Sequence, residues 1–152
     1  MERIFLDANV LIDGMVSRWS VSRAVLVLCA NRVARLVLAE YVKIEVENAL
    51  LTIAQSNRFK PREANRMLED YERFLQLAKP EIVTATESRP LMQQAAIIHH
   101  IHDVPVLAAA LKAQPDWLLS LNRKHFSRAI GQRTGLVIGD PLDYFRARLW
   151  GA

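Results

Sequence analysis

A chain of 152 residues suits one domain and leaves little room for two, so we expect a single domain over residues 1–152. Apolar residues make up 51% of the chain and charged residues 24%, which excludes an intrinsically disordered protein, and the single cysteine, Cys29, excludes an intrachain disulfide and a four-thiolate zinc site. The 20 Lys and Arg residues against 16 Asp and Glu residues give a net charge of +4, which favours a polyanionic partner such as nucleic acid without identifying one.

The chain has no feature typical of a membrane or exported protein. No apolar run approaches the roughly 20 residues that cross a bilayer. The first ten residues, MERIFLDANV, do not have the layout of a signal peptide. We therefore expect a cytoplasmic protein that does not enter a membrane.

In chain order, five short apolar stretches predict strands, and each is followed by at least one helical pattern. Strands are expected at residues 4–6, 35–38, 81–84, 117–120 and 136–138. Helices are expected at residues 7–16, 20–31, 40–56, 61–78, 90–101, 104–113, 123–130 and 141–150. Strands that are apolar throughout and alternate with helices indicate a parallel sheet covered on both faces. With right-handed crossovers, the expected fold is a three-layer α/β/α sandwich with a parallel central sheet.

This architecture indicates where to look for function, because ligands of open parallel sheets bind beyond the carboxyl ends of the strands. The first strand leads directly into Asp7-Ala8-Asn9 and then returns to apolar residues. Asp7 or Asn9 can cap the following helix, but two candidate caps exceed what capping requires. We therefore favour a functional role for Asp7.

Three glutamates follow the second strand, on the helix expected at residues 40–56: Glu40, Glu45 and Glu47. The apolar residues of this helix fall on one stripe that faces the core. Glu45 lies nearest the edge of that stripe, so it is the best placed of the three to face a cleft. Exposed helix glutamates are common, and a solvated role is the alternative.

Two further strand or helix ends carry polar residues. Asp103 precedes Val104-Pro105 at the expected start of an apolar, buried helix, where capping alone would also explain it. The fourth strand leads to Ser120 and Asn122, which could equally form a turn.

The histidines before Asp103 are a possible zinc site. His99, His102 and Asp103 would need to share one helical face to bind zinc, and the expected helix break after Ile101 opposes that. Interfacial or solvated histidines are the alternative.

Asp7, Glu45, Asp103 and Asn122 are thus expected at one edge of the sheet. Carboxylate and amide oxygens without a nearby thiolate favour Mg²⁺ or Mn²⁺. Such a cluster repels itself and would need cations. The reaction that it would serve best is hydrolysis of a phosphodiester by metal-activated water.

The segment after the fourth strand is basic. Between Asn122 and Gly139 it contains no acidic residue. Its basic residues, which could hold phosphates of a nucleic acid or form a solvated helix face, are Arg123, Lys124, Arg128 and Arg133.

These segments together resemble the PIN domain family, and specifically its VapC-like bacterial toxins. The matching stretches, in the expected order, are residues 4–12, 38–45 with Leu50, Asp103 with 106–111, 117–122 with Phe126, and 139–145. The resemblance implies a metal-dependent endoribonuclease in which Asp7, Glu45 and Asp103 bind the metal ion. It also implies that Asn9 supports the first acid, Asp7. Ser120 matches the threonine that usually ends the fourth strand in this family and would have a supporting role as well.

Asn122 departs from the aspartate that many family members have at this position, which predicts weaker binding of a second metal ion. The resemblance further implies the toxin component of a type II toxin–antitoxin system, with an RNA substrate, a small antitoxin protein and a homodimer. The helices expected at 40–56 and 61–78 are candidates for one of these protein surfaces.

Two alternatives stay open. Because of Asn122, the chain could be a catalytically weakened PIN-fold module that binds RNA or protein without cleavage. Asp7 after a first strand is also typical of phosphotransferases with an aspartate nucleophile, but these need a lysine at a strand end, whereas Lys124 is expected within a basic helix. Dinucleotide binding is excluded, since no glycine-rich turn follows any strand.

Overall fold

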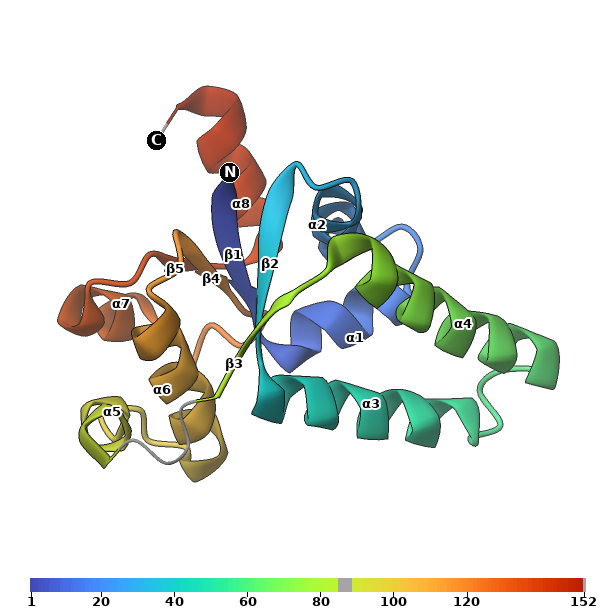
Figure 1. The fold of residues 1–152 in the computed structure, drawn as a ribbon, viewed down its shortest axis with the longest axis horizontal. Coiled ribbons are helices and arrows are strands. Elements are labelled where there is room, and N and C mark those ends of the chain that lie inside the picture. Colours follow the sequence, from blue (N-terminus) through green and yellow to red (C-terminus); the bar gives the residue numbers. More distant parts are fainter. Residues whose placement is uncertain (85–88, 152) are drawn as a thin grey trace.

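The computed structural model describes residues 1–84 and 89–151 and has a five-stranded sheet at its centre (Figure 1). Every neighbouring pair of strands is parallel, and the strand order is β3-β2-β1-β4-β5. The strands are β1 (Glu2–Leu6), β2 (Ala34–Ala39), β3 (Glu81–Val83), β4 (Trp117–Leu119) and β5 (Ile138–Gly139). The predicted parallel sheet is therefore confirmed.

Helices cover both faces of this sheet. They are α1 (Ala8–Val16), α2 (Val21–Ala30), α3 (Glu40–Ala54), α4 (Pro61–Ala78), α5 (Arg89–Ala95), α6 (Val104–Ala113), α7 (Arg128–Thr134) and α8 (Pro141–Trp150), with a 3₁₀ turn at Ile101–Asp103. In Figure 1, α1 to α4 lie on one side of the sheet and α5 to α7 on the other, while α8 packs against β4, β5 and α2. The predicted three-layer α/β/α sandwich is confirmed.

The order of the strands creates a switch point between β1 and β4. From β1 the chain moves outward to β2 and β3, and then crosses the other face to return at β4 and continue to β5. The connections that leave the adjacent strands β1 and β4 therefore run in opposite directions. In such sheets the crevice beyond the carboxyl ends of the two central strands is the usual ligand site.

The core of the molecule is one continuous set of mostly aliphatic side chains. Strand residues such as Phe5 and Leu118 are fully buried, and the apolar helix α6 is buried along residues 106–111. The predicted stripe of α3 is also seen, with Val42, Val46 and Leu50 buried. Both ends of the sheet are thus held rigidly by packing, which positions the residues that follow each strand.

Two predicted helices differ from the structure. The helix expected at 90–101 ends at Ala95, and the following residues reach α6 through the 3₁₀ turn. The helix expected at 123–130 instead begins at Arg128. The Asn122 side chain accepts a hydrogen bond from the His125 backbone N–H, which favours a turn, and Ser127 then caps α7 by accepting from the Ile130 N–H (3.3 Å). Lys124 therefore lies in a loop rather than in a helix.

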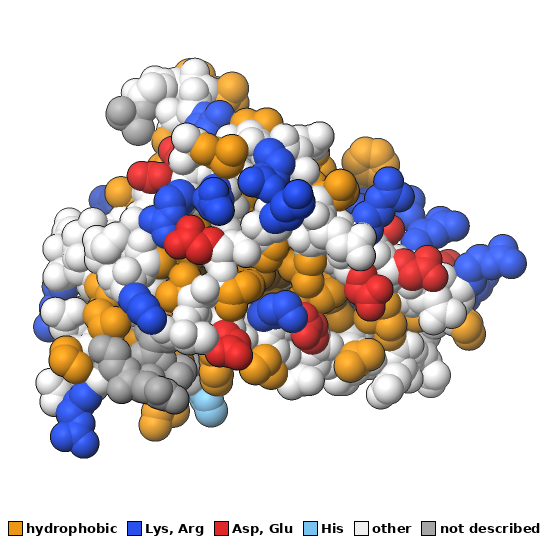
Figure 2. All heavy atoms as spheres, in the orientation of Figure 1, with side chains coloured by type: hydrophobic (Ala, Val, Ile, Leu, Met, Phe, Trp, Pro, Cys, Tyr) orange, Lys and Arg blue, Asp and Glu red, His pale blue; other side chains and the backbone are white. Residues whose placement is uncertain are grey.

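On the face shown in Figure 2, charged side chains of both signs are interspersed. Figure 2 shows Lys and Arg side chains over much of one face, with acidic side chains among them. Among the described helices, none combines the length and the apolar character that crossing a membrane requires. The position of a functional site must therefore be found from its geometry rather than from net charge.

Candidate functional site

Asp7 ends β1 and lies at the switch point, where its carboxylate is buried and surrounded by donors. Only 6% of the residue is exposed. One oxygen accepts a hydrogen bond from the Ala8 N–H (2.8 Å), at the start of α1. The other accepts from the Ser120 hydroxyl (2.8 Å) and from the Asn9 amide (3.2 Å). The side chain is thus held in one orientation by α1 and by the end of β4.

Ser120 and Asn9 connect the ends of β1 and β4. The fully buried Ser120 hydroxyl donates to Asp7 and accepts hydrogen bonds from the Asn122 N–H (3.0 Å) and the Asn9 amide (3.3 Å). The Asn9 carbonyl oxygen accepts from the Leu121 N–H (2.9 Å). The two residues predicted to support Asp7 therefore contact it directly, and they also join the loops that leave the two central strands.

The environment of Asp7 acts on its pKa in two directions. Burial raises the pKa of the carboxyl group above its ordinary value, and the negative charge of Asp103 raises it further. The hydrogen bonds from Ser120, Ala8 and Asn9 oppose this shift by stabilising the charged form. The cost of a buried carboxylate is therefore only partly offset by its donors.

Glu45, on α3, faces the same region. Although the residue is exposed overall, partial burial raises the pKa of its carboxyl group, and the charges of Asp7 and Asp103 raise it further, while His102 opposes the shift. Glu47, two residues along the helix, instead accepts a hydrogen bond from the Tyr71 hydroxyl of α4 (2.8 Å). The structure therefore brings Glu45, rather than Glu47, into the electrostatic field of the two aspartates.

Asp103 precedes α6 but does not cap it through its side chain. Its carboxylate is instead hydrogen bonded to the His125 ring, with 2.6 Å between Oδ2 and Nδ1, and 19% of the side chain is exposed. The His125 ring stacks on the His100 ring, with centroids 3.3 Å apart. Sequence reasoning missed both histidines, because nothing in their local pattern distinguishes them from solvated ones.

Asn122 forms a turn, which is one of the two possibilities that the sequence left open. Its side-chain oxygen accepts from the His125 N–H (3.3 Å), and its own N–H donates to the Ser120 hydroxyl. Asn122 is therefore connected to the Asp7 carboxylate only indirectly, through the Ser120 hydroxyl. Any further role as a ligand stays a prediction.

The basic residues predicted to hold phosphates lie in the loop after β4 and on α7. Lys124, Arg128 and Arg133 are exposed. Arg123 pairs with Asp143 and, at 3.4 Å, with Asp140, both at the start of α8. The positive charge of Arg123 is therefore largely balanced within the protein.

The donor chemistry of Asp7, Glu45 and Asp103 fits a hard divalent cation, since all three supply carboxylate oxygens and their charges repel one another. Within residues 1–84 and 89–151, however, no three His, Cys, Asp or Glu side chains form a group compact enough to hold a metal ion. Asp103 is turned toward His125 instead. The three acids thus share one edge of the sheet without forming a closed set of ligands, and their metal-binding role stays a prediction.

Comparison with known proteins identifies the family. The model of the PIN domain matches residues 3–124. The chain belongs to the PIN domain family. The solved structure of VapBC2 from Rickettsia felis, bound to a DNA fragment from its promoter, is similar in fold, with a TM-score of 0.59 and 16% identity over 91% of this chain and 98% of that one. No curated protein sequence matches this chain.

Membership of the PIN domain family agrees with the sequence segments that suggested it. The matched range contains Asp7, Glu45, Asp103 and Asn122, and it ends at the basic segment that begins with Arg123. Residues 125–151, which include α7, β5 and α8, lie outside the match. The similarity to VapBC2 extends the agreement in fold over most of the chain.

Proposed function

We propose that this PIN domain is a metal-dependent endoribonuclease and the toxin component of a type II toxin–antitoxin system. One observation carries the proposal. Burial raises the pKa of Asp7 and of Glu45, and neighbouring carboxylates at the switch point raise it further: Asp103 acts on Asp7, and both aspartates act on Glu45. A fold gains no stability from such repulsion, so a cationic ligand is the simplest reason for it.

Each side chain has a separate task in this proposal. Asp7, Glu45 and Asp103 would hold Mg²⁺ or Mn²⁺, which activates water and stabilises the leaving oxygen of a phosphodiester. Ser120 and Asn9 hold the Asp7 carboxylate in position through their hydrogen bonds.

Basic residues of the loop after β4 and of α7 would bind the substrate. Lys124, Arg128 and Arg133 are exposed and would contact phosphates on either side of the cleaved bond, together with Arg123. RNA binding should therefore weaken steeply as the salt concentration rises.

The partners are part of the same proposal. The solved structure of similar fold is a VapBC2 complex, which supports an antitoxin protein as a partner of this chain. The hairpin of α3 and α4 extends away from the sheet in Figure 1 and is a candidate surface for the antitoxin or for a second copy of the chain. Co-expression with the neighbouring open reading frame, followed by size-exclusion chromatography, tests both partners.

Cleavage of total RNA tests the activity. Wild-type protein should cleave RNA with Mn²⁺ and not with a chelator, and Asp7→Asn and Asp103→Ala should both abolish cleavage. Glu45→Gln and Glu47→Gln are a matched pair on one helix, because only Glu45 faces the other acids. We expect Glu45→Gln to lose cleavage and Glu47→Gln to keep it. Equal activity of the two variants would contradict the assignment of the site.

The alternative function is an RNA- or protein-binding module without catalysis. Asn122 favours it, because an amide at this position removes one negative charge from the site, and its oxygen already accepts the His125 N–H. RNA binding by the wild type without Mn²⁺-dependent cleavage would support this alternative over the nuclease.

A further inference from the structure

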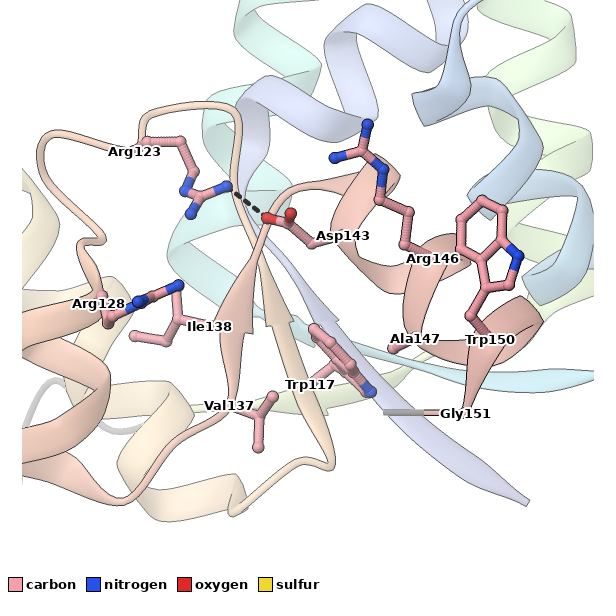
Figure 3. A pocket seen from close by; sticks show the side chains of 10 residues that line it. All are labelled: Trp117, Arg123, Arg128, Val137, Ile138, Asp143, Arg146, Ala147, Trp150 and Gly151. Atoms are coloured by element: carbon pink, nitrogen blue, oxygen red, sulfur yellow. Dashed lines mark hydrogen bonds and ion pairs between the residues drawn. The ribbon is translucent and has the colours of Figure 1, made fainter.

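A second concave site lies between β4, β5 and α8. It is a pocket of about 450 Å³, within the usual size of small-ligand sites. None of Asp7, Glu45 and Asp103 lines it. The lining residues, drawn in Figure 3, are Trp117, Arg123, Arg128, Val137, Ile138, Asp143, Arg146, Ala147, Trp150 and Gly151.

The charge of the pocket favours an anion. It contains three arginines against one acid, Asp143, which pairs with Arg123. Within the described part of the chain, neither Arg128 nor Arg146 forms an ion pair. Figure 3 shows these two arginines on opposite sides of the pocket, Arg128 at the start of α7 and Arg146 on α8. A phosphate group between them would meet guanidinium donors from both walls.

The pocket also has an aromatic wall. Trp150 is 75% exposed in the last turn of α8, four residues after Arg146 and therefore on the same side of the helix. Trp117 lies in the pocket with its ring edge-on to Tyr144, at 5.5 Å between centroids. An exposed indole ring next to guanidinium groups, here that of Trp150, is the combination that binds an unpaired base and its phosphate.

The pocket adjoins the proposed active site along the chain. Ser120 donates to Asp7, and Arg123, which lines the pocket, follows only three residues later. Three extended residues span at most about 11 Å. A single RNA strand lying across Asp7 can therefore reach the Arg123 end of the pocket. Trp150 lies toward the amino end of β1, because the neighbouring Arg148 pairs with Glu2 (2.8 Å).

We propose that this pocket binds one unpaired nucleotide of the RNA substrate, away from the bond that is cleaved. The base stacks on Trp150, and its phosphate lies between Arg128 and Arg146. The identity of the ligand rests on the proposed ribonuclease function. Most of the lining residues lie beyond residue 124, where the match to the PIN domain ends. Because stacking and phosphate contacts tolerate any base, the pocket would add affinity for single-stranded RNA.

Tryptophan fluorescence can measure this binding without cleavage. The protein carries Asp7→Asn to prevent hydrolysis and Trp19→Phe to remove the indole that is 97% exposed elsewhere. The probe is a short 2′-O-methyl oligoribonucleotide of mixed sequence, added without divalent metal. We expect it to quench the fluorescence of the remaining indoles, Trp117 and Trp150.

Substitutions in the pocket then test the assignment. Trp150→Ala should weaken binding of the same probe, followed by anisotropy of a fluorescent label, about tenfold. Arg146→Ala should lower the slope of log affinity against log salt by about 0.7, the value for one lost phosphate contact on a single strand. Arg62→Ala, an exposed arginine of α4 outside the pocket, should leave both quantities unchanged. Trp150 and Arg146 are exposed, so neither change should unfold the protein.

The outcomes separate this inference from the proposed function. If Trp150→Ala and Arg146→Ala bind the probe as tightly as their parent, or if the parent itself does not bind, the pocket is not an RNA site. If the pocket variants weaken binding but the wild type never cleaves RNA with Mn²⁺, the nuclease proposal fails and the nucleotide site stands. If the wild type cleaves RNA and the pocket variants cleave it equally well, the inference about the pocket is overturned and the nuclease proposal stands.

Discussion

Replacing Ser120 by alanine is the most direct test of how the candidate site is held together. The Ser120 hydroxyl is fully buried, donates to the Asp7 carboxylate at 2.8 Å and accepts from two donors, the Asn122 N–H and the Asn9 amide. Ser120→Ala removes all three contacts at once. It leaves a buried carboxylate with one donor fewer and does not introduce any group that could replace it.

The expected loss of stability follows from these contacts. A hydrogen bond to a charged group contributes roughly 1.5–3 kcal/mol, and leaving a buried polar group without its partner adds to the loss. We therefore expect Ser120→Ala to lower the free energy of unfolding by about 2–3 kcal/mol. For a chain of this size, roughly 2–4 °C per kcal/mol gives a decrease in Tm of about 4–12 °C.

The loss should also depend on pH. The Ser120 hydrogen bond lowers the pKa of Asp7, so its removal raises that pKa further above the unfolded value. A carboxyl group whose pKa is raised by folding destabilises the folded state when it is charged, and this cost disappears as the pH falls through the folded pKa. The effect of Ser120→Ala should thus be largest at pH 8 and smaller at pH 5.

Urea unfolding at both pH values measures these effects, and Ser22→Ala is the matched control. Ser22 is 1% exposed, as buried as Ser120, but its hydroxyl has no hydrogen-bond partner among the described residues. Its removal should be neutral or stabilising. Equal losses for the two serine variants, or a loss for Ser120→Ala that does not change with pH, would refute the reasoning.

The remaining predictions concern the acidic residues. Asp7→Asn should keep or raise the Tm at pH 8 in a thermal melt, because it removes a buried charge whose pKa is raised, and a clear decrease would contradict this. The pKa of Asp7 and that of Glu45 are both raised, so their charges should cost less stability as the pH is lowered from 8 toward 5. The free energy of unfolding of the double variant Asp7→Asn, Glu45→Gln should therefore increase less over that pH range than that of the wild type. Asn122→Asp adds a negative charge, so in calorimetry it should bind Mn²⁺ more tightly than the wild type. Added Mn²⁺ should also raise its Tm more than that of the wild type. Unchanged affinity would place residue 122 outside the metal site.

The comparison of expected and observed helices shows which local signals are reliable. The limits expected for α4, α6 and α8 agree with the structure, and each of these helices has a proline in its first turn. Proline there fixes the backbone angle that a helix needs and loses no hydrogen bond. Helix α7 begins five residues later than expected. The competing signal is a hydrogen bond from the His125 N–H to the Asn122 side chain, which only the folded loop reveals.

In the candidate site too, some residues could be predicted from local sequence and others could not. Asp7 and Asp103 could be chosen from the sequence because one follows an apolar strand and the other precedes an apolar helix, and Glu45 because it lies near the edge of the apolar stripe of its helix. His125 could not, since its contact with Asp103 joins residues 22 apart through two loops. The pocket lined by Arg146 and Trp150 was missed for a related reason, as it forms only where α8 packs beside β4 and β5.

The amino-acid sequence by itself determined the alternation of strands and helices, the parallel sheet and the acids at its carboxyl edge, because these depend on the spacing of apolar residues and on local caps. The tertiary structure decided which strand ends become neighbours, and so joined Asp7 to Ser120 across β1 and β4. It also decided how near the three carboxylates come to one another and which partners they choose. Such contacts depend on strand order and on competing side-chain partners far along the chain, neither of which is encoded in any short segment.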